Sequence, residues 1–209
     1  MVMTGHGLFG AGAWQSGLTL VLEAVAVMGS PGPSTMAVMA TSAAFGCRRS
    51  LKFVSGAIAG TVAVLLAVAT GVVALMMSVP SLGLGLTLAS AVYILYLALK
   101  IAIAPPLSRQ AGAGLAPSFA AGLLLAIANP KAWFAIAAVF TGSTLAASAA
   151  SDALLKAAGL AVMIVLIHLF WMFGGVSLAG FLGDPVRSRL TNVAFGLILV
   201  ATTVVALIR

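Results

Sequence analysis

Two proline-centred motifs carry most of the polar chemistry of this 209-residue chain. The first reads Ser-Pro-Gly-Pro-Ser over residues 30–34, and the second reads Asn-Pro-Lys over residues 129–131. A proline has no N–H and disrupts the helical hydrogen bond to the carbonyl four residues earlier, so each motif should break a helix. The N-terminus of a restarted helix attracts anions, and the freed carbonyls can accept hydrogen bonds from an ammonium group. The two motifs together therefore suit a zwitterion such as an amino acid.

We expect the residues of both motifs to bind the substrate. They are Ser30, Pro31, Gly32, Pro33, Ser34, Asn129, Pro130 and Lys131. Ser30 and Asn129 are the expected N-caps of the restarted half-helices. The prolines should free the carbonyls of Val27, Gly29 and Ala126. The alternative is that the prolines only kink membrane helices for packing.

Three titratable residues within apolar stretches are further candidates. Lys131 would neutralise a substrate carboxylate or pair with Glu23, unless it only reaches into a cytoplasmic vestibule. Glu23 suits proton coupling because a carboxylate inside a membrane is costly, unless the first helix starts later and leaves Glu23 at the wet boundary. His168 could relay protons, although a hydrogen-bonded structural histidine is the alternative. No grouping of His, Cys and acidic residues in the sequence predicts a metal site or a cofactor.

The composition predicts an integral membrane protein. Hydrophobic residues make up 63% of the chain and charged residues only 6%, whereas a soluble domain has about 25% charged residues. This excludes a soluble globular enzyme. The net charge of +7 reflects the presence of only three acidic residues and not a basic patch, so it does not indicate binding to nucleic acid.

Charge-free intervals of about 20 residues or more predict the membrane spans. With a turn at 78–83, they give six helices, at 17–45, 53–77, 84–104, 118–142, 154–180 and 190–208. Residues 1–16 are the expected N-terminal tail, and residues 17–209 are a single transmembrane domain. Lys and Arg concentrate in loops on one side, which places that side in the cytoplasm and both termini outside. If residues 17–45 enter the membrane as a hairpin and do not cross it, the chain has five spans and its N-terminus lies inside.

The two broken helices indicate an internal repeat. Pro31 and Pro130 lie 99 residues apart, and a similar shift lays the second helix on the fifth. The halves, about 17–104 and 118–209, contain three spans each, so the second copy must be inverted. Broken helices at matching positions of inverted halves point to the binding site of a secondary transporter. The expected fold class is thus an all-α integral membrane protein of six transmembrane helices, forming two inverted three-helix repeats with broken first helices.

At these residues the chain resembles the lysine exporter (LysE) superfamily, in its homoserine/threonine-resistance (RhtB) branch. The shared features are Ser-Pro-Gly-Pro at 30–33, Phe-Gly-Cys-Arg-Arg at 45–49, Gly56, Gly60, Tyr-x-x-Tyr-Leu at 93–97, Phe119, Gly122 and Asn-Pro-Lys-Ala at 129–132. The resemblance covers about 18–205. It implies a bacterial inner-membrane exporter of amino acids or close derivatives, driven by the proton motive force. Ser34 stands where relatives often have Asp or Asn, so substrate identity does not carry over.

Other functions remain as alternatives. A cation or metal exporter on the same scaffold would want several carboxylates or soft ligands, and the expected spans contain one acid. An intramembrane hydrolase would need Ser30 or Ser34 as nucleophile with His168 as base, and no Gly-x-Ser-x-Gly motif occurs. A non-transporting scaffold protein is the third. The expected partners are the amino acid, protons and membrane lipids, and the glycine-rich second helix could support a homodimer.

Overall fold

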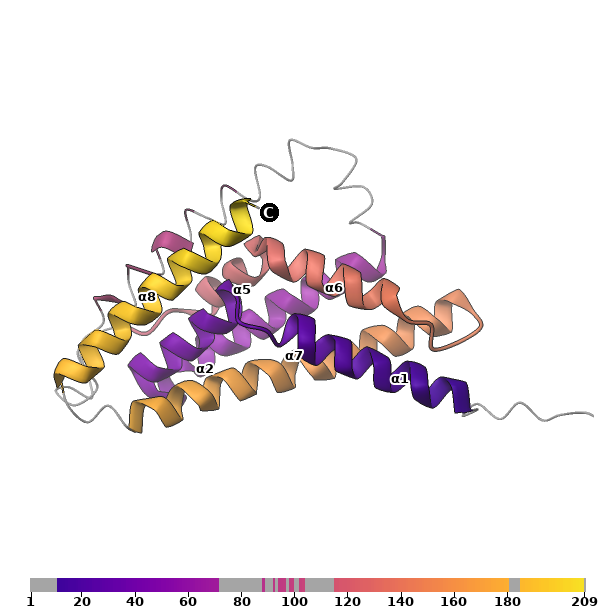
Figure 1. Cartoon of the computed structure of the whole chain (residues 1–209), viewed down its shortest axis with the longest axis horizontal. Coiled ribbons are helices and arrows are strands. Elements are labelled where there is room, and N and C mark those ends of the chain that lie inside the picture. Colours follow the sequence, from indigo (N-terminus) through magenta and orange to yellow (C-terminus); the bar gives the residue numbers. More distant parts are fainter. Residues whose placement is uncertain are drawn as a thin grey trace, which may run out of the picture.

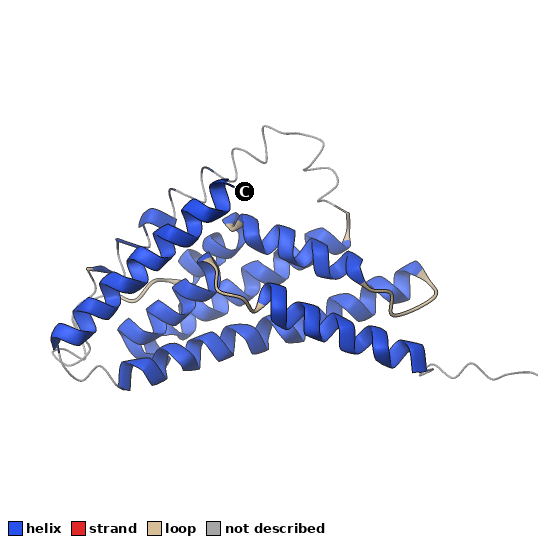
Figure 2. Cartoon of the chain, viewed as in Figure 1, coloured by secondary structure: helices blue, strands red, loops and turns tan. Residues whose placement is uncertain are grey.

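The described part of the chain is entirely helical. The computed structural model describes residues 11–71, 115–180 and 185–208, together with positions 88, 92, 94–96, 98–99 and 102–103. Its elements are α1 (Ala11–Glu23), a short π-helix η1 (Ala24–Met28), α2 (Pro33–Ala69), α5 (Phe119–Ala128), α6 (Pro130–Gly142), α7 (Ala149–Gly180) and α8 (Pro185–Ile208) (Figures 1 and 2). The expected all-α class is therefore confirmed for these residues.

Two of the described helices are long and apolar enough to cross a membrane. They are Pro33–Ala69 and Ala149–Leu178, and the pair α5 and α6, bent by 62°, adds a third if the pair forms one span. Large apolar side chains also face outward, for example Trp14 at 75% and Phe170 at 72% exposure. Outward-facing apolar surface of this extent indicates contact with lipid. The chain is therefore a membrane protein.

A single glycine turns the chain back within α2. Gly46 has φ 74° and ψ 170°, in a region that glycine reaches without steric cost. The hydroxyl of Ser50 donates to the carbonyl of Thr41 at 3.1 Å, although nine residues of straight helix would span about 13 Å. The expected loop between the helices at 17–45 and 53–77 was therefore wrong. Residues 47–52 already belong to the second helical arm, and the turn needs only Gly46.

Most expected helices are present with shifted ends. α1 begins at Ala11 and not at 17, α7 begins at Ala149 and not at 154, and α8 begins at Pro185 and not at 190. The second arm of α2 ends at Ala69, eight residues before its expected end. The expected turn at 78–83 lies outside the described residues, as does most of the helix expected at 84–104.

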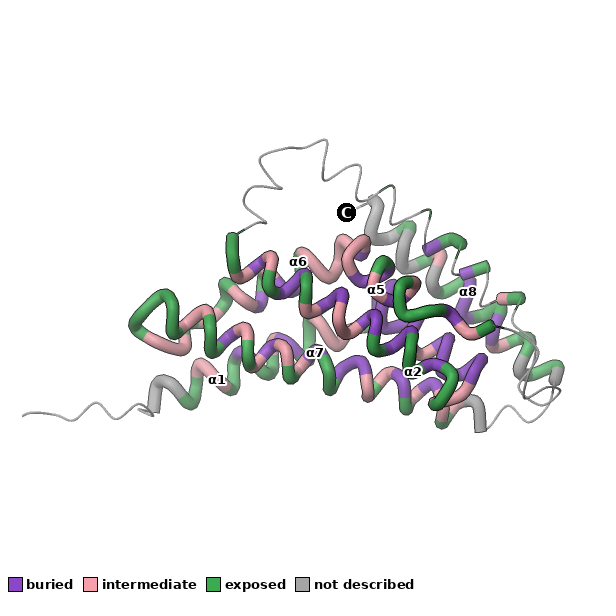
Figure 3. Tube along the Cα trace, turned by 180° about the vertical axis from the view of Figure 1, so that it is seen from behind, coloured by how far each residue is buried: buried purple, intermediate pink, exposed green. Residues whose placement is uncertain are grey.

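Helix α2 forms the centre of the packing. It contacts α5, α6, α7 and α8. Seen from behind in Figure 3, buried positions follow the inner faces of α2 and α7, and exposed positions follow the outer faces. One core cluster joins Ala40 and Phe53 of α2 to Leu125 of α5, Met172 of α7 and Phe195 of α8. The first arm of α2, which begins directly after the first break, is thus held by elements from the second half of the sequence.

Glycines bring the backbones of α2 and α5 into contact. A Cβ atom added to Gly56 or Gly60 would meet the backbone of α5, and one added to Gly122 would meet the carbonyl of Phe53. Only a residue without a side chain fits such a crossing. These glycines therefore fix how closely the helix before the second break approaches α2.

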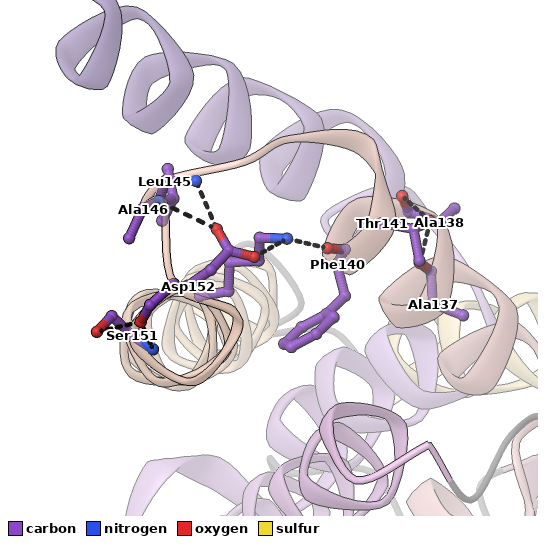
Figure 4. A network of polar contacts seen from close by, with 10 residues as sticks. Ala137, Ala138, Phe140, Thr141, Leu145, Ala146, Ser151 and Asp152 are labelled. Carbon is purple, nitrogen blue, oxygen red and sulfur yellow. Dashed lines mark hydrogen bonds and ion pairs between the residues drawn. The ribbon is translucent and has the colours of Figure 1, made fainter.

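A polar network closes the connection between α6 and α7. One carboxylate oxygen of Asp152 accepts from the backbone N–H groups of Leu145 at 2.6 Å and Ala146 at 3.3 Å, and the other pairs with Lys156 at 2.7 Å. Lys156 also donates to the carbonyl of Phe140 at 2.9 Å (Figure 4). Because Lys156 is buried, its ion pair with Asp152 compensates its charge within this connection.

Replacing Gly122 with alanine should destabilise the protein by about 1–3 kcal/mol, because the added methyl group would push α5 away from α2. The midpoint of thermal unfolding in detergent measures the effect. Gly174→Ala is the matched control, since it lies in a helix and its added Cβ meets no atom within 4 Å. Equal midpoints for the two variants would contradict the close crossing.

Candidate functional site

The breaks of two helices meet at the side chain of Lys131. The first break covers residues 29–32, between η1 and α2, and the second lies at Asn129, between α5 and α6. The ammonium of Lys131 donates to the carbonyl of Ser30 at 2.6 Å, to its hydroxyl at 2.8 Å, and to the carbonyl of Pro31 at 3.1 Å. An ammonium group has three N–H donors, and here each has an acceptor. Lys131 therefore ties one broken helix to the other.

The carbonyls expected to be freed by proline are all occupied. That of Val27 accepts from the Ser30 hydroxyl at 2.8 Å, and that of Gly29 accepts from the Trp171 indole at 3.1 Å. That of Ala126 accepts from the backbone N–H of Asn129 at 3.3 Å. Carbonyls in an apolar medium must find such partners. The ammonium found in the first break belongs to Lys131, so in this conformation the protein itself fills the position expected for a substrate ammonium.

Of the two expected N-caps, one is confirmed and one is wrong. The side chain of Asn129 accepts from the backbone N–H of Lys131 at 3.2 Å, so it caps α6. The N-cap of α2 is Gly32 and not Ser30, and the hydroxyl of Thr35 accepts from the Gly32 N–H at 2.9 Å. Ser30 lies two residues too early, because Pro33, and not Pro31, occupies the first position of the helix.

A small cavity lies beside this junction. Its volume is about 40 Å³, which is room for about three waters. It is lined by Met28, Gly32, Ser34, Thr35, Thr61, Asn129, Lys131, Ala132, Ala135, Ile136, Ile164, Ile167 and His168. Four of the eight expected substrate-binding residues are in this lining. The other four are not in the lining. Ser30 and Pro31 accept hydrogen bonds from Lys131, and Pro33 and Pro130 are the first residues of α2 and α6.

The lining includes residues that were not singled out from the sequence. Thr35 and Thr61 add hydroxyl groups from the two arms of α2, and Thr61 donates to the carbonyl of Ala57 at 2.8 Å. For Thr61 the available signal was a lone hydroxyl within an apolar span, and for Thr35 it was its position directly after Ser34. Trp171 follows His168 by three residues in the sequence, but its contact with the carbonyl of Gly29, 142 residues away, leaves no trace there.

The two proton-coupling candidates lie in different places. His168 lines the cavity, and its Nδ1 lies 2.7 Å from the carbonyl of Ile164. Glu23 lies against Gly142, at the far end of α6, where a Cβ on that glycine would be 2.8 Å from the carboxylate. Gly142 and Lys131 are eleven residues apart, or about 16 Å along a helix. The expected alternative of a Lys131–Glu23 pair is therefore wrong, and Lys131 is paired with the first break.

Comparison with known proteins gives one match. The sequence model of the LysE type translocator family matches residues 25–209, which include both breaks and the whole cavity lining. This match confirms the resemblance to the lysine exporter superfamily. No curated protein and no solved structure matches the chain significantly.

Replacing Gly32 with alanine should displace the ammonium of Lys131. The backbone at Gly32 is extended (φ −167°, ψ 177°), so alanine fits it, but the new Cβ would lie 2.7 Å from Cδ and 2.9 Å from Nζ of Lys131. We expect an amine-reactive reagent to modify Lys131 about fivefold faster, the factor for losing one hydrogen bond of about 1 kcal/mol. Peptide mass spectrometry measures this rate. Gly17→Ala, whose Cβ meets nothing within 4 Å, should leave the rate unchanged.

Proposed function

Because the chain belongs to the LysE type translocator family, we propose that it is a secondary active exporter of amino acids or close derivatives. One observation supports this proposal above the others: the ammonium of Lys131, on one broken helix, lies in the break of another. Broken helices that meet within a membrane protein are the usual place for a transported solute. We further propose the six-helix arrangement of two inverted repeats, in the bacterial inner membrane with both termini outside.

The substrate carboxylate would bind the ammonium of Lys131. Among the residues that line the cavity, only Lys131 and His168 have side chains that can carry a charge. The ammonium of Lys131 suits a carboxylate, because its N–H groups can donate to the carboxylate oxygens. The N-terminus of α2 adds a favourable field, because Ser34 and Thr35 lie in its first turn, where backbone N–H groups lack helical partners. The positive charge of Lys131 disfavours the alternative of a cation or metal exporter on the same scaffold.

Binding would loosen the contact between the two broken helices. A cavity with room for about three waters encloses only part of an amino acid, and in the proposed cycle its walls move apart on binding. When a carboxylate takes the ammonium of Lys131, the carbonyls of Ser30 and Pro31 lose their shared donor. The two halves are then free to rock, which is how alternating access works in folds of inverted repeats. Protons driven by the membrane gradient would return through Glu23 or His168.

Inside-out membrane vesicles test this function. With an imposed pH gradient and a panel of radiolabelled amino acids, the wild type should accumulate one or a few of them. Lys131→Met should lower that uptake by at least about tenfold, because a charge-assisted hydrogen bond contributes about 1.5–3 kcal/mol. Pro31→Ala should also lower it, since residue 31 regains an N–H and a less restricted backbone, which can shift the carbonyl that accepts from Lys131.

Lys52→Met is the matched control, because Lys52 is an exposed lysine of α2 and does not line the cavity. Its uptake should equal that of the wild type. A folded wild type that accumulates no amino acid would contradict the proposed function. Full uptake by Lys131→Met would contradict the proposed site.

A further inference from the structure

His168 lines the cavity, and one of its ring nitrogens has no hydrogen-bond partner among the described residues. The residue is only 4% exposed. Its Nδ1 lies 2.7 Å from the carbonyl of Ile164, and a carbonyl can only accept, so Nδ1 carries the hydrogen. In the neutral imidazole, Nε2 is then a lone-pair acceptor. Nε2 is buried and has no hydrogen-bond partner among the described residues.

An unpartnered buried acceptor needs an explanation. Leaving such a group unsatisfied costs about 1–3 kcal/mol, so a histidine retained only for packing would be expected to bond through both nitrogens. His168 instead lines a cavity with room for water. Ser34 lines the same cavity, and its buried hydroxyl also lacks a partner in the described structure. The two groups therefore offer a hydrogen-bonding subsite on the α7 and α2 sides of the cavity, whereas Lys131 lies on the α6 side.

The charged groups around His168 are few. From α6, Lys131 lines the same cavity. From α1, Glu23 lies against Gly142 and does not line it. The cationic residues of α2 follow the turn at Gly46 and are absent from the lining, and Lys156 of α7 pairs with Asp152. Among the described residues that line the cavity, Nε2 of His168 is thus the atom placed to take up a proton.

We propose that Nε2 of His168 is the atom for which a proton and the substrate compete. This inference rests on the proposed export function. In the outward-bound step, the ammonium or a hydroxyl of the amino acid donates to Nε2 while its carboxylate binds Lys131. In the return step, a proton adds to the same lone pair, and no covalent bond to carbon or nitrogen breaks.

Such competition couples the two fluxes. One lone pair cannot hold a proton and accept a hydrogen bond at the same time. The resulting imidazolium would also repel the substrate ammonium in a cavity of low dielectric constant. A proton entering from outside therefore displaces the substrate, and a substrate arriving from the cytoplasm displaces the proton. One proton moves in for each amino acid that moves out.

The competition is measurable with the wild type alone. In proteoliposomes, the counterflow exchange of labelled L-threonine, L-alanine or L-leucine is followed between about pH 8 and about pH 4.5, a range that extends well below the usual titration of histidine. The concentration for half-saturation should rise as the pH falls, by up to about tenfold per pH unit, while the exchange rate at saturation changes little. A half-saturation concentration that does not depend on pH would overturn the proposal.

Three variants separate the roles of the imidazole. His168→Gln keeps an oxygen that can accept from the substrate but cannot take up a proton, so exchange should persist while its pH dependence and the gradient-driven accumulation are lost. His168→Phe, which can do neither, should lose both activities. Lys52→Met should retain the pH dependence of half-saturation, because Lys52 is an exposed residue of α2 and does not line the cavity.

The outcomes distinguish this inference from the export function. If the wild type exchanges none of the labelled amino acids, the proposed function fails and this inference fails with it. If the wild type accumulates an amino acid and His168→Gln does so equally in response to the pH gradient, only the inference is overturned. If His168→Gln does not fold, the pH series of the wild type decides.

Discussion

The structure depends on one requirement, that every backbone carbonyl exposed by a broken helix must find a donor. In hydrocarbon each unsatisfied group costs several kcal/mol, so a break is stable only where other parts of the protein cover it. Here Lys131 and Trp171, both more than 90 residues further along the chain, supply donors to the first break. The first half of the molecule is therefore completed by the second, and the cavity lies where they join.

Small residues make this junction possible. Gly32 leaves room for the Lys131 side chain, which a methyl group would displace. Gly56 and Gly122 let α5 lie against the second arm of α2, which carries Thr61 to the cavity. Close backbone contact takes the place of large interlocking side chains at this crossing, as is common where helices associate in membranes. The geometry of the site thus depends as much on absent side chains as on the polar ones that line it.

Much of this arrangement could be predicted from the sequence, because its signals are local. Proline chemistry identified both breaks, and the short polar side chain of Asn129 identified the cap of α6. Two features could not be predicted for physical reasons. Gly46 turns the chain within one residue, whereas the charges of Arg48, Arg49 and Lys52 suggested a loop. A charge pattern cannot reveal a φ of 74°. The partner of Lys131 was also missed, since a contact across 101 residues is set by how the helices pack.

In the proposed cycle, the carboxylate of a transported amino acid replaces the first break as the partner of Lys131. The decisive measurement is an experimental structure of the protein in lipid with an exported amino acid bound. In that structure the carboxylate should lie within hydrogen-bonding distance of the Lys131 ammonium, beside the N-terminus of α2, and this ammonium should have left Ser30 and Pro31. An amino acid bound elsewhere, with the contacts of Lys131 to Ser30 and Pro31 intact, would contradict it.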